Sequence, residues 1–268
     1  MKAVIIAAGQ EQHPHQHQQR QFCPSLLLLA NKPLIRHQLR AIRKAGITEA
    51  IISFRCPEIA DYLRHHSSEG VSVVFDRPTA VREPAVVLRA DVLPYGDLVE
   101  PAGSRAPDAD GDMATIRTAD DYLAASATVL GQLATDPQDL SEVMDGVWTD
   151  WPAFIDPTAA ITGPVVLGRN CSIAAGAVII GPCVLGHAAM VCRNAVVRNS
   201  IILPGAAIGA NARVTSSIIA ECFTIGPGAV FDRCIAVGED ALPLEPGTLA
   251  VEHSPRGRAF AGRTRNDE

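Results

Sequence analysis

The sequence predicts a shortened α/β domain followed by a parallel β-helix built from six-residue repeats. An aliphatic residue recurs at every sixth position from Ile155 onward, and the first half of the chain alternates short apolar runs with amphipathic stretches. Aromatic residues make up only 4% of the 268 residues, which suits short strands and tight corners that stack small side chains. A chain of this length forms two modest cores more readily than one large core.

The composition argues against several classes of protein. The net charge is -6 and no basic stripe is present, so we expect no nucleic-acid partner. The apolar run at Met1–Ile6 is too short for a signal peptide, and no later segment is long enough to span a bilayer. We therefore expect a cytoplasmic protein with no membrane partner. The seven cysteines include no CxxC pair, which favours structural thiols.

The first domain alternates strand and helix patterns. Its first helix carries Leu34, Leu39 and Ile42 at helical spacing and stops at Gly46, a common helix end. Alternation of this kind predicts a doubly wound, mostly parallel sheet. The expected elements, in order, are strand Lys2–Ala8, a polar loop from Gly9 to about Cys23, helix Pro33–Ala45, strand Ala50–Ser53, helix Ile59–His65, strand Val71–Phe75 and strand Ala85–Leu88.

The second half has a period of six. Small residues stand four places after each aliphatic residue, and glycines fall at or near the expected turns. A helix is excluded because the 3.6-residue period is missing and Gly or Pro interrupts most turns. The phase slips by one residue after Leu203, resuming at Ile208, and slips again at Ile219. The unbroken aliphatic series is Ile155, Ile161, Leu167, Ile173, Ile179, Leu185, Val191, Val197 and Leu203.

These patterns divide the chain into three parts. We expect the α/β domain over residues 1–150, the β-helix over residues 151–250 and a disordered tail over residues 251–268. Three hexapeptides make one coil, so the segment from Ile155 to Val237 gives four to five coils. A helix over Ala119–Leu133, with Tyr122 and Leu130 on one side, is expected to pack against a core.

Several segments match the motifs of one family. Lys2–Gly9 matches its opening strand and turn, and Ala30–Ile35 matches its run into the first helix. Val87–Leu93 is similar to a strand that ends in a metal-binding aspartate, here Asp91, and Thr118–Leu123 is similar to the helix start just after a second such aspartate. These segments resemble the sugar-nucleotide pyrophosphorylases, including the mannose-1-phosphate guanylyltransferase branch, which join a nucleoside triphosphate to a sugar 1-phosphate and release pyrophosphate.

The resemblance carries expectations for fold and binding. It implies that the first domain is nucleotidyltransferase-like and that the β-helix is left-handed, with homo-oligomers of three or more chains formed through the coil faces. It also implies magnesium at Asp91 if nucleotidyl transfer is retained. No other cofactor is indicated. The residues that the resemblance places at the nucleotide are Ala7, Ala8, Gly9 and Gln10.

The catalytic residues of the family are missing. Glu11 and His13 stand near the places of its glycine and arginine, and the lysine place falls on Pro24 or Ser25. Such a loop needs close backbone approach and positive side chains to offset the phosphate charge. Thr115 occupies the place of the second metal-binding aspartate, and Asp110 or Asp112 could substitute only if the loop rearranged. The domain is also much shorter than those of the family.

The sequence therefore predicts a catalytically inactive, pyrophosphorylase-like protein that acts as a nucleotide-binding or sugar-nucleotide-binding, regulatory or scaffolding subunit. An active homologous subunit is a candidate partner. Two alternatives stay open: an active nucleotidyltransferase, and a hexapeptide-repeat acyltransferase in which His187 is the general base. His13, His15 and His17 alternate in a glutamine-rich loop and would form a transition-metal site only if that loop were extended.

Overall fold

The chain forms two compact units, Met1–Ile116 and Arg117–Glu268. The computed structural model describes residues 2–6, 26–53, 57–66, 68–76, 85–89, 91–94, 113–237 and 240–243. The boundary lies earlier than the expected position at residue 150, because the segment after Ile116 associates with the repeat region. Part of that segment even pairs with the repeats in one sheet. The tail expected over residues 251–268 lies outside the described residues.

The first unit contains a four-stranded parallel sheet in the order β5-β4-β1-β6. Two helices connect successive parallel strands of this sheet. The strand order reverses beside β1, since β4 and β5 lie on one side of it and β6 on the other. The predicted parallel sheet is thus confirmed. Its elements are β1 (Lys2–Ile6), α1 (Leu34–Lys44), β4 (Glu49–Ser53), α2 (Pro57–His65), β5 (Ser72–Asp76) and β6 (Ala85–Arg89).

Aliphatic residues from every one of these elements form the core of the first unit. Ile5, Leu39 and Ile52 are almost fully buried within it. The helix α1 presents one apolar side to the sheet, as the spacing of its leucines and isoleucines predicts. Its opposite side carries Arg36, whose guanidinium donates a hydrogen bond to the carboxylate of Glu69, a residue outside this helix.

Two short hairpins in this unit have no counterpart in the sequence prediction. β2 (Leu28–Leu29) and β3 (Lys32–Pro33) pair antiparallel through Ala30 and Asn31, which have φ angles of 48° and 62°. Two left-handed residues in a row are typical of the tight turns that join twisted strands. A second antiparallel pair joins β7 (Val92–Pro94) to β8 (Met113–Thr115).

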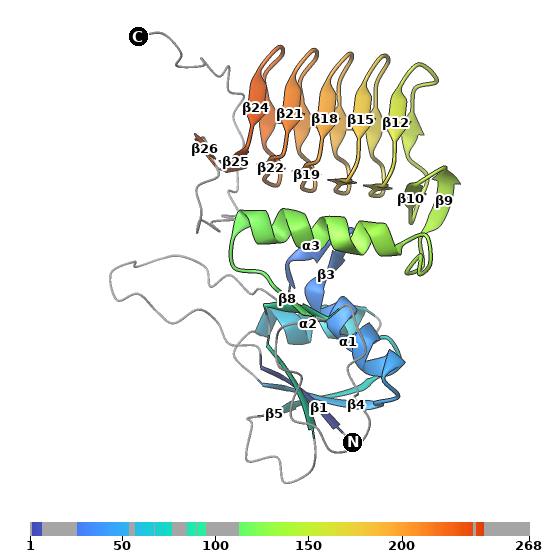
Figure 1. The fold of residues 1–268 in the computed structure, drawn as a ribbon, viewed down its shortest axis with the longest axis vertical. Helices are drawn as coiled ribbons and strands as arrows, with labels where there is room; N and C mark the ends of the chain where they lie inside the picture. The colour runs from blue at the N-terminus through green and yellow to red at the C-terminus, as the bar shows by residue number, and fades with distance from the viewer. Residues whose placement is uncertain are drawn as a thin grey trace. The chain divides into compact units, whose positions relative to one another are not determined.

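The second unit is a β-solenoid of about five turns over residues 147–236, with three sheets running along its length (Figure 1). The first sheet comprises β9 (Ser141–Met144), β10 (Val147–Thr149), β13 (Val165–Leu167), β16 (Cys183–Leu185), β19 (Ile201–Ile202), β22 (Ile218–Ile219), β25 (Cys234–Val237) and β26 (Asp240–Pro243). The second comprises β11 (Phe154–Ile155), β14 (Ser172–Ile173), β17 (Met190–Val191), β20 (Ala207–Ile208) and β23 (Thr224–Ile225). The third comprises β12 (Ala160–Thr162), β15 (Val178–Ile180), β18 (Val196–Arg198), β21 (Arg213–Thr215) and β24 (Val230–Asp232).

The coils change length part-way along the solenoid. Ile155 pairs with Ile173, eighteen residues later, whereas Val191 pairs with Ile208, seventeen residues later. The register loses one residue at the corner after β18, so Ile202 joins the core and Leu203 does not. The predicted slip is therefore real but comes one repeat earlier than expected.

A different corner accounts for the lost residue. The earlier coils turn from the third sheet to the first through Gly163-Pro164 and Gly181-Pro182, both cis. The later coils use a single left-handed residue instead. Asn199, Ser216 and Arg233 hold these corner places, with φ angles of 46°, 45° and 47°. We call these three residues the corner column.

A buried ladder lies next to the corner column. The Ser200 hydroxyl accepts a hydrogen bond from the backbone N–H of Ser217 at 3.1 Å, and the Ser217 hydroxyl accepts one from Cys234 at 3.1 Å. Each of these serines also donates to a backbone carbonyl in its own coil. The ladder therefore satisfies backbone groups that the shorter corner would otherwise leave buried and unpaired.

The first sheet is apolar on both faces. In its parallel strands, from β10 to β25, the outward side chains are buried as fully as the inward ones, which is characteristic of parallel sheets covered on both faces. The helix α3 (Ala119–Gln132) runs along this sheet in the direction in which the coils stack (Figure 1). Thr118 and Asp121 form a capping box that fixes its first turn. The outward, buried residues are Trp148, Val166, Val184, Ile201, Ile218 and Ile235.

A membrane-spanning helix is absent from the part of the chain that the structure describes, where every helix is too short or too polar to cross a bilayer.

The close stacking of coils makes one glycine substitution diagnostic. A Cβ on Gly168 would stand 2.7 Å from both Gly186 C and His187 N of the next coil, so Gly168→Ala must displace backbone. We expect it to lower the free energy of unfolding by about 2 kcal/mol. Gly131→Ala in α3, where the added Cβ meets nothing within 4 Å, is the matched control. It is expected to raise stability by about 0.5–1 kcal/mol. Urea unfolding of both variants checks this, and equal effects would contradict the packing described.

Candidate functional site

The first candidate site lies at the carboxyl ends of β1 and β6, where the strand order of the parallel sheet reverses. Open α/β sheets bind their ligands at this kind of reversal. Asp91 follows β6 by two residues and is half-buried. The residues expected at the nucleotide, namely Ala7, Ala8, Gly9 and Gln10, lie outside the described residues, as do His13, His15 and His17.

Two hydrogen bonds fix the backbone around Asp91. Its carbonyl oxygen accepts from the backbone N–H of Ile116 at 2.7 Å. On the other side, the Gln38 side-chain amide in α1 donates to the carbonyl of Val92 at 2.8 Å. Gln38 is fully buried, so this bond is made away from water. The strand end that carries Asp91 is therefore held by both α1 and β8.

The same hairpin brings Thr115 beside Asp91. Val92 pairs directly with Thr115, so the two positions expected to hold the metal are one register place apart. One position carries a carboxylate and the other a hydroxyl. Magnesium is usually held by carboxylates together with the phosphates of its substrate. Among the residues that the structure describes, no three His, Cys, Asp or Glu side chains gather into a metal site.

The residues present therefore do not fit the magnesium site of an active nucleotidyltransferase. A hydroxyl is a neutral and weaker ligand for a hard divalent cation than a carboxylate. Asp110 and Asp112, which would have to replace the second carboxylate, lie outside the described residues. We derive no chemical step through a metal ion.

A buried histidine beside this site was not identified from the sequence. His37 in α1 lies next to Gln38, and its Nε2 donates to the carbonyl of Leu29 at 3.0 Å. Burial, together with the nearby positive charge of Lys32, lowers the pKa of His37 to about 4. His37 is thus neutral at pH 7 and ties α1 to the β2–β3 hairpin. Its position on the helix face toward the core was the only signal in the sequence.

The second candidate residue, His187, lies at the corner between the first and second sheets. Its Nδ1 accepts a hydrogen bond at 3.0 Å from the backbone N–H of Arg169 in the preceding coil. A general base needs a free lone pair on one ring nitrogen. Here Nδ1 accepts the hydrogen bond from Arg169 and is not available to take a proton from a substrate. This geometry makes His187 a link between coils and argues against acyl transfer.

The cysteines of the repeats behave as structural thiols. Cys171 and Cys183 are buried in the solenoid core and form no disulfide. The Cys171 thiol donates to Gly186 O at 2.9 Å, and the Cys183 thiol donates to Ile180 O at 3.1 Å. Burial raises the pKa of each thiol to about 11, so neither is a nucleophile at neutral pH.

The comparisons with known proteins bear on the solenoid. Residues 161–242, less than a third of the chain, match the family model described as the GMPPB C-terminal domain. The resemblance to the sugar-nucleotide pyrophosphorylases is confirmed for this region. No curated protein matches the chain.

Among solved structures, the chain is similar to one described as the acetyltransferase domain of PglB from Neisseria gonorrhoeae FA1090. The identity is 14%, the match covers 97% of this chain and 96% of that one, and the TM-score is 0.30. A score this low carries no argument about the fold or activity of this chain.

Burial of His37 predicts a pH dependence of stability. Its pKa is about 4 in the folded state and 6.5 when exposed, so the unfolded chain binds the proton more tightly between these values. Stability contributed by the neutral ring is present above pH 6.5 and is lost as the pH falls toward 4. Chemical unfolding should show a loss of roughly 3 kcal/mol from this residue across that window.

The variant His37→Gln has no titrating ring and keeps an amide donor for Leu29 O. We expect its stability to fall less steeply than that of the unchanged protein between pH 6.5 and 4. His66→Gln, at an exposed position, is the control and should leave the slope as it is. Identical slopes in all three proteins would show that His37 is not the group responsible.

Proposed function

We propose that this protein is a sugar-nucleotide pyrophosphorylase-like subunit that binds a nucleotide or sugar nucleotide at the strand ends of its first unit and does not catalyse nucleotidyl transfer. The observation that carries the proposal is the pairing of Val92 with Thr115, which sets a hydroxyl beside Asp91 where an active site would need a second carboxylate. The strand end is well held, since Gln38 and Ile116 both bond to it.

The sequence of the first loop supports the loss of activity independently. Glu11 stands where a close approach of backbone to phosphate calls for glycine, and His13 stands in place of the arginine. A carboxylate beside a triphosphate repels it, and a mostly neutral imidazole at pH 7 offsets little charge. Loss of a single charge-stabilising group in an active site commonly costs about 10²–10³ in rate. Binding of a less charged sugar nucleotide requires fewer such groups.

We also propose that the protein is cytoplasmic and assembles through its solenoid into a homo-oligomer, with an active homologous subunit as a further candidate partner. β-Helix folds often oligomerise. The second sheet exposes Phe154 and Met190 on its outer face, at 68% and 48% of their surface. Removal of these side chains from water favours association. Measurement of the molar mass by light scattering tests this part of the proposal, and a monomer at micromolar concentration would contradict it.

The absence of catalysis is tested by an assay of pyrophosphate release. The purified protein is mixed with each nucleoside triphosphate, a panel of sugar 1-phosphates and Mg²⁺. We expect no release above a blank without protein, because the charge developing on the phosphates has too few partners. A sugar-nucleotide pyrophosphorylase run in parallel shows that the assay works. Turnover in the ordinary range for enzymes, about 1–10³ s⁻¹, would overturn the proposal.

Binding without a metal predicts an unusual effect of Asp91. With no cation between them, the Asp91 carboxylate repels the phosphates of a bound sugar nucleotide. Asp91→Asn should therefore leave affinity unchanged or tighten it by about threefold, equally in Mg²⁺ and in EDTA. Calorimetry with a panel of sugar nucleotides measures this. Asp61→Asn, on the exposed surface of α2, is the control. A loss of tenfold or more that appears only with Mg²⁺ would show that Asp91 still holds a metal.

A further inference from the structure

A cavity lies within the second unit, between the helix α3 and the corner column. Its volume is about 280 Å³, at the low end of the range for small-molecule sites. One wall consists of residues from the first three turns of α3, and the other consists of Asn199, Ser216 and Arg233. The cavity has no part in the strand-end site of the first unit, so its function is independent of the one proposed above.

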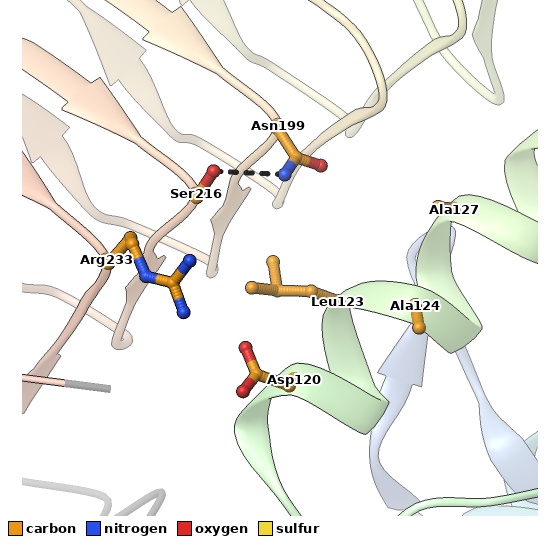
Figure 2. Close-up of a pocket in the computed structure, with 7 residues that line it drawn as sticks. All are labelled: Asp120, Leu123, Ala124, Ala127, Asn199, Ser216 and Arg233. Carbon is orange, nitrogen blue, oxygen red and sulfur yellow. Dashed lines mark hydrogen bonds between the residues drawn. The ribbon is translucent and has the colours of Figure 1, made fainter. Parts of the chain in front are cut away.

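Two opposite charges face this cavity. Figure 2 shows the carboxylate of Asp120 and the guanidinium of Arg233 directed toward the same space. Within the described part of the chain, neither Asp120 nor Arg233 forms an ion pair of 4.0 Å or less. They are the two charged residues among those that line the cavity. A cation and an anion held apart across a cavity are both available to a ligand that carries the complementary charges.

The polar wall is built from residues that the fold holds in place. The Asn199 side-chain amide donates to the Ser216 hydroxyl at 3.1 Å, which links two successive coils (Figure 2). Ser216 therefore keeps its own hydroxyl proton for a further acceptor. Below it, Arg233 adopts a left-handed backbone with φ of 47°, which favours Gly or Asn over Arg. The corner imposes this conformation at all three places of the corner column.

Apart from Asp120, the wall formed by α3 is apolar. Leu123 projects from α3 toward the same space as the two charged groups, and Ala127 lies one turn further along α3 (Figure 2). A ligand with a small apolar group can pack against this side while its polar groups meet Asp120 and Arg233. The cavity offers no second cation that would favour a phosphate over a carboxylate.

We propose that this cavity binds a small zwitterion, an α-amino acid with an apolar side chain. Its ammonium group lies against Asp120, its carboxylate lies against Arg233 and the Ser216 hydroxyl, and its side chain lies against Leu123. One positive and one negative group match this class of ligand. A pure anion is repelled by Asp120, and a pure cation is repelled by Arg233.

The experiment is calorimetry of the full chain with each of the twenty L-amino acids, and with inorganic phosphate and putrescine as single-charge probes in the sense that each carries charge of one sign only. One or more of leucine, isoleucine, valine and methionine is expected to bind, and the two single-charge probes are not. Asp120→Asn and Arg233→Gln should each weaken binding by about tenfold, because each removes one charge partner. Circular dichroism confirms that both variants are folded.

The matched controls are Asp232→Asn and Arg213→Gln. Each removes the same charge from an exposed position in the same solenoid that does not line the cavity. Neither should change amino-acid affinity by more than about twofold. The proposal fails if no amino acid binds, or if the controls weaken binding as much as the cavity variants do. Phosphate binding that strengthens in Asp120→Asn would identify an anion site instead, and putrescine binding that strengthens in Arg233→Gln would identify a cation site.

Discussion

The packing of each coil directly upon the next is the constraint on which the rest of the second unit depends. At the corner between the first and second sheets, the backbone of Gly168 lies against that of Gly186 and His187, with no room for a Cβ. Because the backbones lie so close, each strand pairs with the equivalent strand of the next coil. Each strand also places an aliphatic residue in the interior of the solenoid. The interior is thus filled with apolar side chains, and the groups that could meet a ligand lie on the outer surface of the solenoid or at its corners.

The change from eighteen to seventeen residues per coil has consequences at one corner. The shorter turn replaces Gly-Pro with a single left-handed residue, and its backbone groups are satisfied by the ladder of Ser200 and Ser217. Because successive corners stack, Asn199, Ser216 and Arg233 form a row beside α3. The change in coil length therefore replaces a corner of glycine and proline, which offers no functional side chain, with one that presents an amide, a hydroxyl and a guanidinium.

Much of this architecture could be predicted from the sequence, because it follows from periodicity. The sequence predicts the order of strands and helices in the first unit, and its lack of a CxxC pair favours the structural thiols that the structure has at Cys171 and Cys183. The sequence shows the one-residue slip but places it after Leu203. Ile201, Ile202 and Leu203 are all aliphatic, and only their pairing with the neighbouring coil shows which of them points inward. The side chains of His37 and Gln38 in α1 donate hydrogen bonds to Leu29 in β2 and Val92 in β7. No local sequence pattern indicates these partners.

The backbone of the strand-end site is held in place whether or not the site catalyses a reaction. Gln38 is buried, and removal of its bond to Val92 would strand a polar group away from water at a cost of about 1–3 kcal/mol. The free energy of unfolding would fall by this amount whether or not the protein is an enzyme. The second metal ligand is different, since a hydroxyl at Thr115 fits the same half-exposed place on β8 and leaves the pairing with Val92 intact. The stability of the fold therefore requires the backbone that presents Asp91. A carboxylate at the position of Thr115 would be required only for catalysis.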